Sequence, residues 1–111
     1  MKQIQTQTKM SKAIDGVNTY AIEAMRALKY GDTVDSIKIC DLGIKTYYSE
    51  LFRANKDNTE REFQRRADIY LEIAKLYGIR GDEGLKNVCI RQSELALKDA
   101  MALANAKRGT D

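Results

Sequence analysis

The sequence contains no proline, no histidine and no tryptophan. The absence of proline permits long uninterrupted helices, because proline removes a backbone donor and breaks a helix interior. The absence of histidine removes the commonest general base and the commonest metal ligand together. The two cysteines, Cys40 and Cys89, are too few for a structural zinc site, which takes four Cys or His ligands. These absences predict a protein that is not an enzyme and that has no catalytic residues, no metal site and no cofactor.

Long apolar runs are also absent. No stretch approaches the roughly 18 residues that a membrane span needs, and the N-terminal MKQIQTQTKM lacks the apolar core of a secretory signal. Unpaired thiols are typical of a reducing compartment, and a single Cys40–Cys89 bridge is the alternative. We therefore expect a cytoplasmic protein with no membrane partner, and 111 residues predict a single domain over 1–111.

Two stretches of the chain resemble each other, Tyr20–Cys40 and Tyr70–Cys89. Each begins with Tyr, reaches a Gly-Asp pair eleven residues later, and then runs into an apolar segment that contains one Cys. This pattern indicates two helix–turn–helix units in tandem. The matching positions are Tyr20 and Tyr70, Ala24 and Ala74, Gly31-Asp32 and Gly81-Asp82, and Cys40 and Cys89.

Apolar residues recur at alternating spacings of three and four in most of four segments, which predicts four amphipathic helices. Gly31 and Gly81 are expected to end the first and third helices. Asp32, Thr59 and Asp82 are expected to cap the second, third and fourth. The four stripes are Ile14, Val17, Ala21, Ala24 and Leu28; Ile37, Cys40, Ile44, Tyr47 and Leu51; Phe63, Ala67, Tyr70, Ala74 and Tyr77; and Leu85, Val88, Leu95, Ala96 and Leu103.

The predicted fold is all-α, with four antiparallel helices arranged as two tandem helical hairpins. The hairpins cover about 11–55 and about 59–107, and residues 1–10 are expected to fray or to extend the first helix. A closed four-helix bundle and an open array of two hairpins both satisfy the pattern. Gly43, inside the second helix, costs about 1 kcal/mol against Ala, so it predicts a close approach of a neighbouring helix.

The segment Ala74-Lys75-Leu76-Tyr77, followed by Gly81-Asp82, resembles the tetratricopeptide repeat. The resemblance lies in the small residue, the Tyr and the Gly-Asp at the turn, and it covers about thirty residues. It implies a helical-hairpin scaffold that binds peptides or proteins.

The last two helices carry more apolar residues than a surface helix needs, since a stripe of about 100° is enough to face a core. We interpret the surplus as a partner-binding surface, with burial by the N-terminal segment or by tight packing as the alternative. The candidate partner-binding residues are Ile90, Leu97 and Met101 on the fourth helix and Ile69, Ile73 and Leu76 on the third.

Positive charge gathers at the end where the 55–58 turn and both termini meet, and it defines a second candidate site. Acidic side chains lie among these residues, which favours a solvated, salt-bridged end over a phosphate-binding one. Asp41 and Asp99 lie near apolar faces and are expected to pair with Lys or Arg, for instance Arg66, or to lie at an oligomer interface. The candidate anion-binding residues are Arg53, Lys56, Arg61, Arg65 and Arg66.

The sequence therefore favours a small helical protein that works by protein–protein interaction, as a regulator, an inhibitor or an assembly subunit. Self-association into a homo-oligomer is expected, and the alternative is a nucleic-acid-binding accessory protein that uses the basic end.

Overall fold

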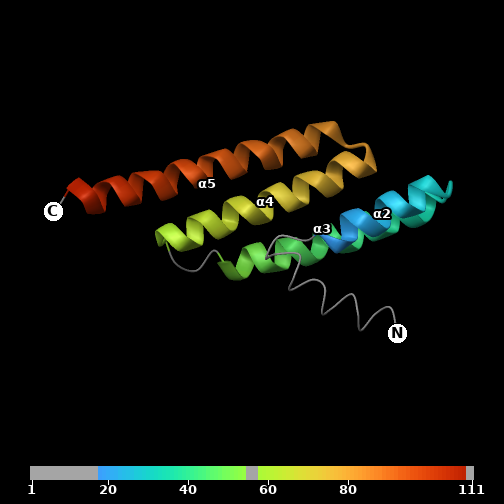
Figure 1. Ribbon diagram of the computed structural model, residues 1–111, viewed down its shortest axis with the longest axis horizontal. Coiled ribbons are helices and arrows are strands. Elements are labelled where there is room, and N and C mark those ends of the chain that lie inside the picture. The colour runs from blue at the N-terminus through green and yellow to red at the C-terminus, as the bar shows by residue number, and fades with distance from the viewer. Residues whose placement is uncertain (1–17, 55–57, 110–111) are drawn as a thin grey trace.

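The computed structural model describes residues 18–54 and 58–109, and these residues form an all-α structure without strands (Figure 1). The helices are α2 (Thr19–Lys29), α3 (Thr33–Ala54), α4 (Glu60–Arg80) and α5 (Glu83–Gly109). The predicted all-α class is confirmed. Ile14 and Val17 of the first predicted stripe, together with the segment 1–10, lie outside the described residues.

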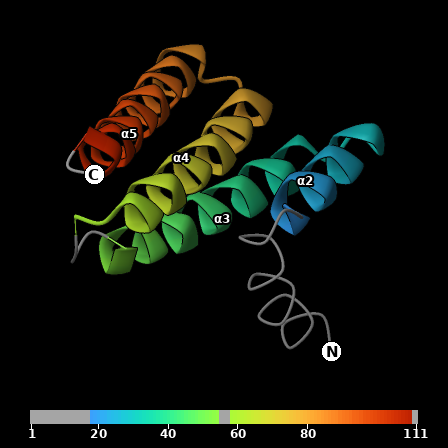
Figure 2. The ribbon, with the colours of Figure 1, turned by 60° about the vertical axis from the view of Figure 1, so that its left-hand side comes forward.

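The helices pack in the order in which they occur in the chain. α3, α4 and α5 run side by side, and α2 lies against α3 and touches α4 (Figures 1 and 2). The backbone of α5 comes close to α4 but not to α2 or α3. Within the described residues the arrangement is therefore the open array of two hairpins, and α5 is its edge.

The predicted turns and caps are present. Gly31 and Gly81 adopt φ of 78° and 92°, the left-handed region that a residue without Cβ enters without strain. The side-chain oxygens of Asp32, Thr59 and Asp82 each accept a hydrogen bond from the backbone N–H three residues later, at 3.0, 3.1 and 3.2 Å. Each of these bonds satisfies one of the unpaired donors in the first turn of a helix.

The cap of α2 was not predicted. Asn18 Oδ1 accepts from the backbone N–H of Ala21 at 3.0 Å, which begins the helix at Thr19. Asn18 Nδ2 donates to Oε1 of Glu72 at 3.0 Å and to the Glu72 carbonyl at 3.3 Å. One buried side chain thus caps α2 and fixes it to α4.

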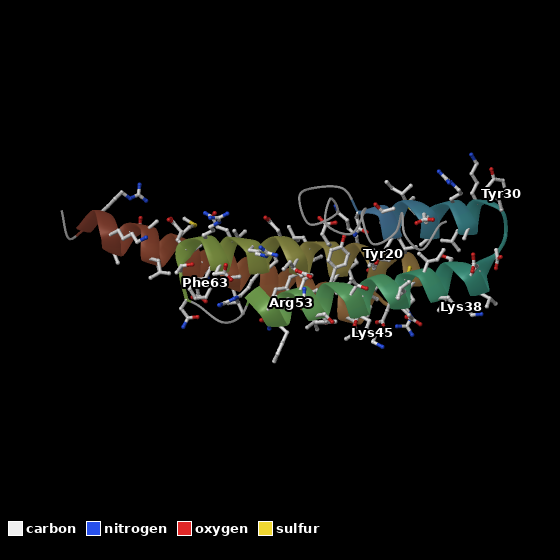
Figure 3. All side chains as sticks on the ribbon, turned by 90° about the horizontal axis from the view of Figure 1, so that it is seen from below. Tyr20, Tyr30, Lys38, Lys45, Arg53 and Phe63 are labelled. Atoms are coloured by element: carbon white, nitrogen blue, oxygen red, sulfur yellow. The ribbon has the colours of Figure 1, made fainter. Side chains whose placement is uncertain are left out.

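Gly43 marks the closest approach in the first hairpin, as the sequence predicts. A Cβ at this position would lie 2.6 Å from Leu76 Cδ1 and 2.7 Å from Tyr20 Cγ. Tyr20 points into the space between α2 and α3 (Figure 3), where its ring meets that of Tyr47 edge-on with centroids 6.1 Å apart. α2, α3 and α4 therefore meet around one glycine.

α5 packs on α4 through small side chains. Cys89, Ser93, Ala96 and Ala100 are buried along one stripe, which we call the α5 seam. Ser93 Oγ donates to the carbonyl of Ala67 on α4 at 2.9 Å. Small side chains allow two helices to approach closely, so this stripe makes the contact although it contains no large apolar residue.

The predicted packing face of α5 is wrong for three of its five residues. Leu85, Val88 and Leu95 are 42, 52 and 48% exposed. Leu28 and Ile37 in the earlier stripes are exposed as well. The prediction rested on large apolar residues, whereas the contact between α5 and α4 is made by small ones.

Candidate protein-interaction surface

α5 carries exposed apolar residues on both sides of its seam. We call Ile90, Leu97 and Met101 the Leu97 row, and Leu85, Val88 and Leu95 the Leu95 row. At 100° per residue the two rows lie on opposite flanks of the helix, with the seam between them on one side and charged residues between them on the other. Leu97 and Met101 are 43 and 64% exposed, and Ile90 is half-buried.

A shallow depression of about 540 Å³ runs along the outer side of α5. Its apolar margin comes from both rows, and its charged part comes from the residues between them. No residue of α2, α3 or α4 lines it among the described residues. The lining residues are Arg91, Glu94, Leu95, Leu97, Lys98 and Met101.

Three of the predicted partner-binding residues are not on this surface. Ile69, Ile73 and Leu76 are buried in the core, together with residues of α2, α3 and α5. α4 lies between α3 and α5, so it needs two apolar sides, and this is why its apolar arc is wide. The prediction of these three as partner-binding residues is wrong, and they hold the fold together.

The Leu95 row continues onto aromatic residues of α4. A groove of about 170 Å³ lies between the two helices, with Phe63, Arg66 and Tyr70 on the α4 side. Gln92, Leu95, Ala96 and Asp99 line its α5 side. Nearby, Tyr48 of α3 reaches Cys89 of α5, with its hydroxyl 3.8 Å from Sγ. This aromatic extension was not predicted, although Phe63 and Tyr70 lie seven residues apart, on one face of the helix.

Two arginines of the basic end share one carboxylate, that of Glu50. Glu50 is buried, and its two oxygens accept from Arg53 Nη1 at 2.9 Å and from Arg65 Nη2 at 3.3 Å. Arg53 and Phe63 lie toward the end of the array where α3 finishes and α4 starts (Figure 3). The two guanidinium groups share one negative charge, which lowers their availability to phosphates.

The other predicted anion-binding residues do not form a patch with this pair. Arg66 is buried, donates to Asn58 Oδ1 at 3.3 Å and stacks over the ring of Phe63 at 4.6 Å. Arg61 is exposed on α4, and Lys56 lies outside the described residues. The structure therefore brings Arg53 and Arg65 together through Glu50 and assigns Arg66 to packing.

Asp41 and the two cysteines also had predicted roles. Asp41 forms an ion pair with Arg80 at 3.1 Å, so its predicted pairing with a basic residue is confirmed. Cys40 and Cys89 are free and buried, and burial raises the pKa of both thiols. A protonated buried thiol is a poor nucleophile at neutral pH, so neither cysteine forms a reactive centre in this arrangement.

No family model, curated protein or solved structure matches the chain. Over 18–54 and 58–109 no three His, Cys, Asp or Glu side chains gather in a way that could hold a metal ion. No helix in the same residues has the length and apolar character to cross a membrane. Large apolar side chains are also exposed on α2 and α3, for instance Met25 and Phe52, and on the edge helix α5 they form two rows.

Proposed function

We propose that this is a non-catalytic cytoplasmic protein that acts by binding other protein chains through α5, as a regulator, an inhibitor or an assembly subunit. One observation carries the proposal: among the described helices the backbone of α5 approaches only α4, and α5 leaves large apolar side chains exposed on both flanks of a small-residue seam. Contiguous exposed apolar residues on a soluble helix are typical of an interface. The free, buried cysteines fit a reducing compartment.

The energetics favour a partner that covers both rows. Fully burying a Leu or Met side chain contributes about 1.5–3 kcal/mol, and Leu95, Leu97 and Met101 are still 48, 43 and 64% exposed. Covering the rest of each contributes about 1 kcal/mol, whereas association costs roughly 4–15 kcal/mol. One row is therefore too small a contact, and a helix lying along the depression on α5 would engage both.

A second candidate, contact with nucleic-acid phosphates at the basic end, has weaker support. The exposed guanidinium of Arg61 favours it, and the pairing of Arg53 and Arg65 with Glu50 opposes it. Phosphate binding weakens steeply with added salt, whereas apolar association does not. A salt titration of any complex therefore separates the two candidates.

The proposal can be tested by site-specific photo-crosslinking in the native cell. A photoreactive phenylalanine analogue replaces Leu97 in one variant, and it replaces Asp68, an exposed polar residue of α4, in the matched control. We expect discrete protein adducts from position 97 and only diffuse background from position 68. Mass spectrometry identifies each adduct, including a second copy of this chain.

The outcome that contradicts the proposal is equal background labelling at both positions, with circular dichroism confirming that both variants are helical. Adducts that disappear after nuclease treatment would instead support the nucleic-acid candidate.

A further inference from the structure

The outer side of α5 has a charge pattern that complements itself. Arg91, Glu94 and Lys98 lie between the Leu97 row and the Leu95 row and line the same depression. Arg91 and Lys98 are exposed, and Glu94 lies between them in the sequence and is exposed as well. Glu94 and Lys98 carry opposite charges, so a reversed copy of α5 can place Lys98 opposite Glu94 and Glu94 opposite Lys98.

The register of such a pairing follows from helix length. α5 runs from Glu83 to Gly109, so its middle residue is Ala96. When two copies lie antiparallel with their middle residues level, they overlap over the full helix, about 40 Å at 1.5 Å per residue. Glu94 and Lys98 are each two residues from Ala96, on opposite sides of it. Full overlap therefore places Glu94 of each copy across from Lys98 of the other.

The same register matches the apolar residues. The two-fold axis that relates two antiparallel copies keeps each flank on the same side. The Leu95 row of one copy therefore lies beside the Leu95 row of the second copy, and the two Leu97 rows meet on the other flank. A parallel pairing would instead place Arg91, Glu94 and Lys98 against the same residues of the second copy, and like charges directly opposed are destabilising. Charge thus favours the antiparallel orientation, and full overlap of the two helices selects the register in which Glu94 lies opposite Lys98.

The ends of the helix fit this arrangement as well. α5 has 27 residues and α4 has 21, so the C-terminal end of α5 extends past the start of α4 (Figure 1). In the antiparallel register this overhang lies beside the first turn of α5 in the second copy. Arg108 then approaches Glu83 of the second copy, which is an exposed carboxylate. Antiparallel packing also places the positive N-terminal end of each helix dipole beside the negative C-terminal end of the other, which is favourable.

We propose that α5 binds a second copy of this chain, antiparallel and centred on Ala96, with reciprocal Glu94–Lys98 pairs between apolar rows. This inference rests on the proposed function and names the partner of the same surface. Two α4–α5 hairpins then form a four-helix layer in which each edge helix gains a second neighbour.

The test uses charge reversal in the full chain. Glu94→Lys and Lys98→Glu each create two like-charge contacts across the dimer, whereas the double variant restores two opposite-charge contacts. By sedimentation equilibrium at low salt, we expect each single variant to raise the dimer dissociation constant roughly tenfold or more. The double variant returns to within about threefold of the wild type. An equimolar mixture of the two single variants forms a heterodimer more tightly than either forms a homodimer.

Controls separate these effects from changes within the helix. Glu94 and Lys98 are also four residues apart in one helix, where a pair is worth only about 0.2–0.5 kcal/mol, and mixing two variants cannot restore that contact. Asp68→Lys on α4 is the matched charge reversal outside the interface and should leave the dissociation constant unchanged. Circular dichroism confirms that every variant remains helical.

Three outcomes overturn the inference: a wild type that is monomeric at about 100 µM, single variants that associate as the wild type does, and a mixture without heterodimer. If any of these occurs while position 97 crosslinks to a different protein, the proposed function stands and the second copy is excluded. If position 97 gives no adduct either, both fail.

Discussion

Replacing Gly43 with Ala should destabilise the first hairpin, although Ala is the better helix former. Gly43 lies in α3 where Tyr20 of α2 and Leu76 of α4 converge. The added Cβ would lie 2.6 Å from Leu76 Cδ1, 2.7 Å from Tyr20 Cγ and 2.8 Å from Tyr20 Cβ. The methyl group of Leu76 can rotate away. Tyr20 Cβ is bonded to the backbone, so α2 itself has to shift.

The magnitude follows from two opposed effects. Ala in place of Gly gains about 1 kcal/mol in a helix interior, whereas overpacking a tight core costs typically 1–3 kcal/mol. Three contacts below 3 Å, one of them next to the backbone, place this site at the upper end of that cost. We expect Gly43→Ala to lower the free energy of unfolding by about 1–2 kcal/mol and Tm by roughly 5–15 °C.

Urea unfolding followed by circular dichroism measures this change, and Gly84→Ala is the matched control. Gly84 lies in the first turn of α5, is exposed, and has no neighbour closer than 3.9 Å to an added Cβ. The control should stabilise by about 0.5–1 kcal/mol. Amide exchange should show that Gly43→Ala loses protection first in α2, because α2 is the element displaced. If Gly43→Ala matches Gly84→Ala in sign, the close packing of α2, α3 and α4 is refuted.

Four further predictions concern the seam, the thiols and a cap. Ala96→Leu should cost about 1–3 kcal/mol by forcing α5 away from α4, while Ala102→Leu, exposed on the same helix, should stay within about 0.5 kcal/mol in urea unfolding. Cys40 and Cys89 should react with iodoacetamide at pH 8 more than about tenfold more slowly in the native protein than in urea, and fast native labelling would contradict their burial. Because burial raises both thiol pKa values, their contribution to stability is complete below the unfolded pKa of about 8.5 and declines as pH rises above it, which thermal melts between pH 7 and 10 can follow. Thr59→Ala should cost about 0.5–2 kcal/mol in urea unfolding through loss of the α4 cap, and an unchanged midpoint would mean that water replaces its hydroxyl.

The turns and caps could be predicted because their chemistry is local. A Gly-Asp pair supplies a left-handed residue and then a carboxylate cap, and both Gly31-Asp32 and Gly81-Asp82 behave in this way. Gly43 was predictable for a related reason, since a glycine inside a helix costs free energy that a close contact can offset. The role of Asn18 could not be predicted, because it depends on a contact with Glu72, which is fifty-four residues away in the sequence.

The face of α5 that packs on α4 could not be found by counting large apolar residues. Leu, Val and Met mark a buried stripe only where a neighbour covers them, and α5 is an edge helix whose backbone approaches only α4 among the described helices. The internal repeat does indicate which face of α5 packs on α4. At an offset of forty-nine residues, which relates Cys40 to Cys89, the positions of the buried stripe of α3 correspond to those of the α5 seam. Ile44, Tyr47 and Leu51 become Ser93, Ala96 and Ala100.

The same offset gives a reason to expect a helix against the Leu97 row. Ile90 occupies the position of Asp41, and Leu97 that of Tyr48. In the first hairpin these two residues of α3 meet the next hairpin: Asp41 pairs with Arg80 of α4, and Tyr48 contacts Cys89 of α5. α4 runs antiparallel to α3 there, so the repeat geometry predicts an antiparallel helix beside Leu97 as well. No such helix lies there among the described residues. Asp41 and Tyr48 of α3 are charged or partly polar, whereas their counterparts in α5, Ile90 and Leu97, are apolar and can be covered by a partner helix.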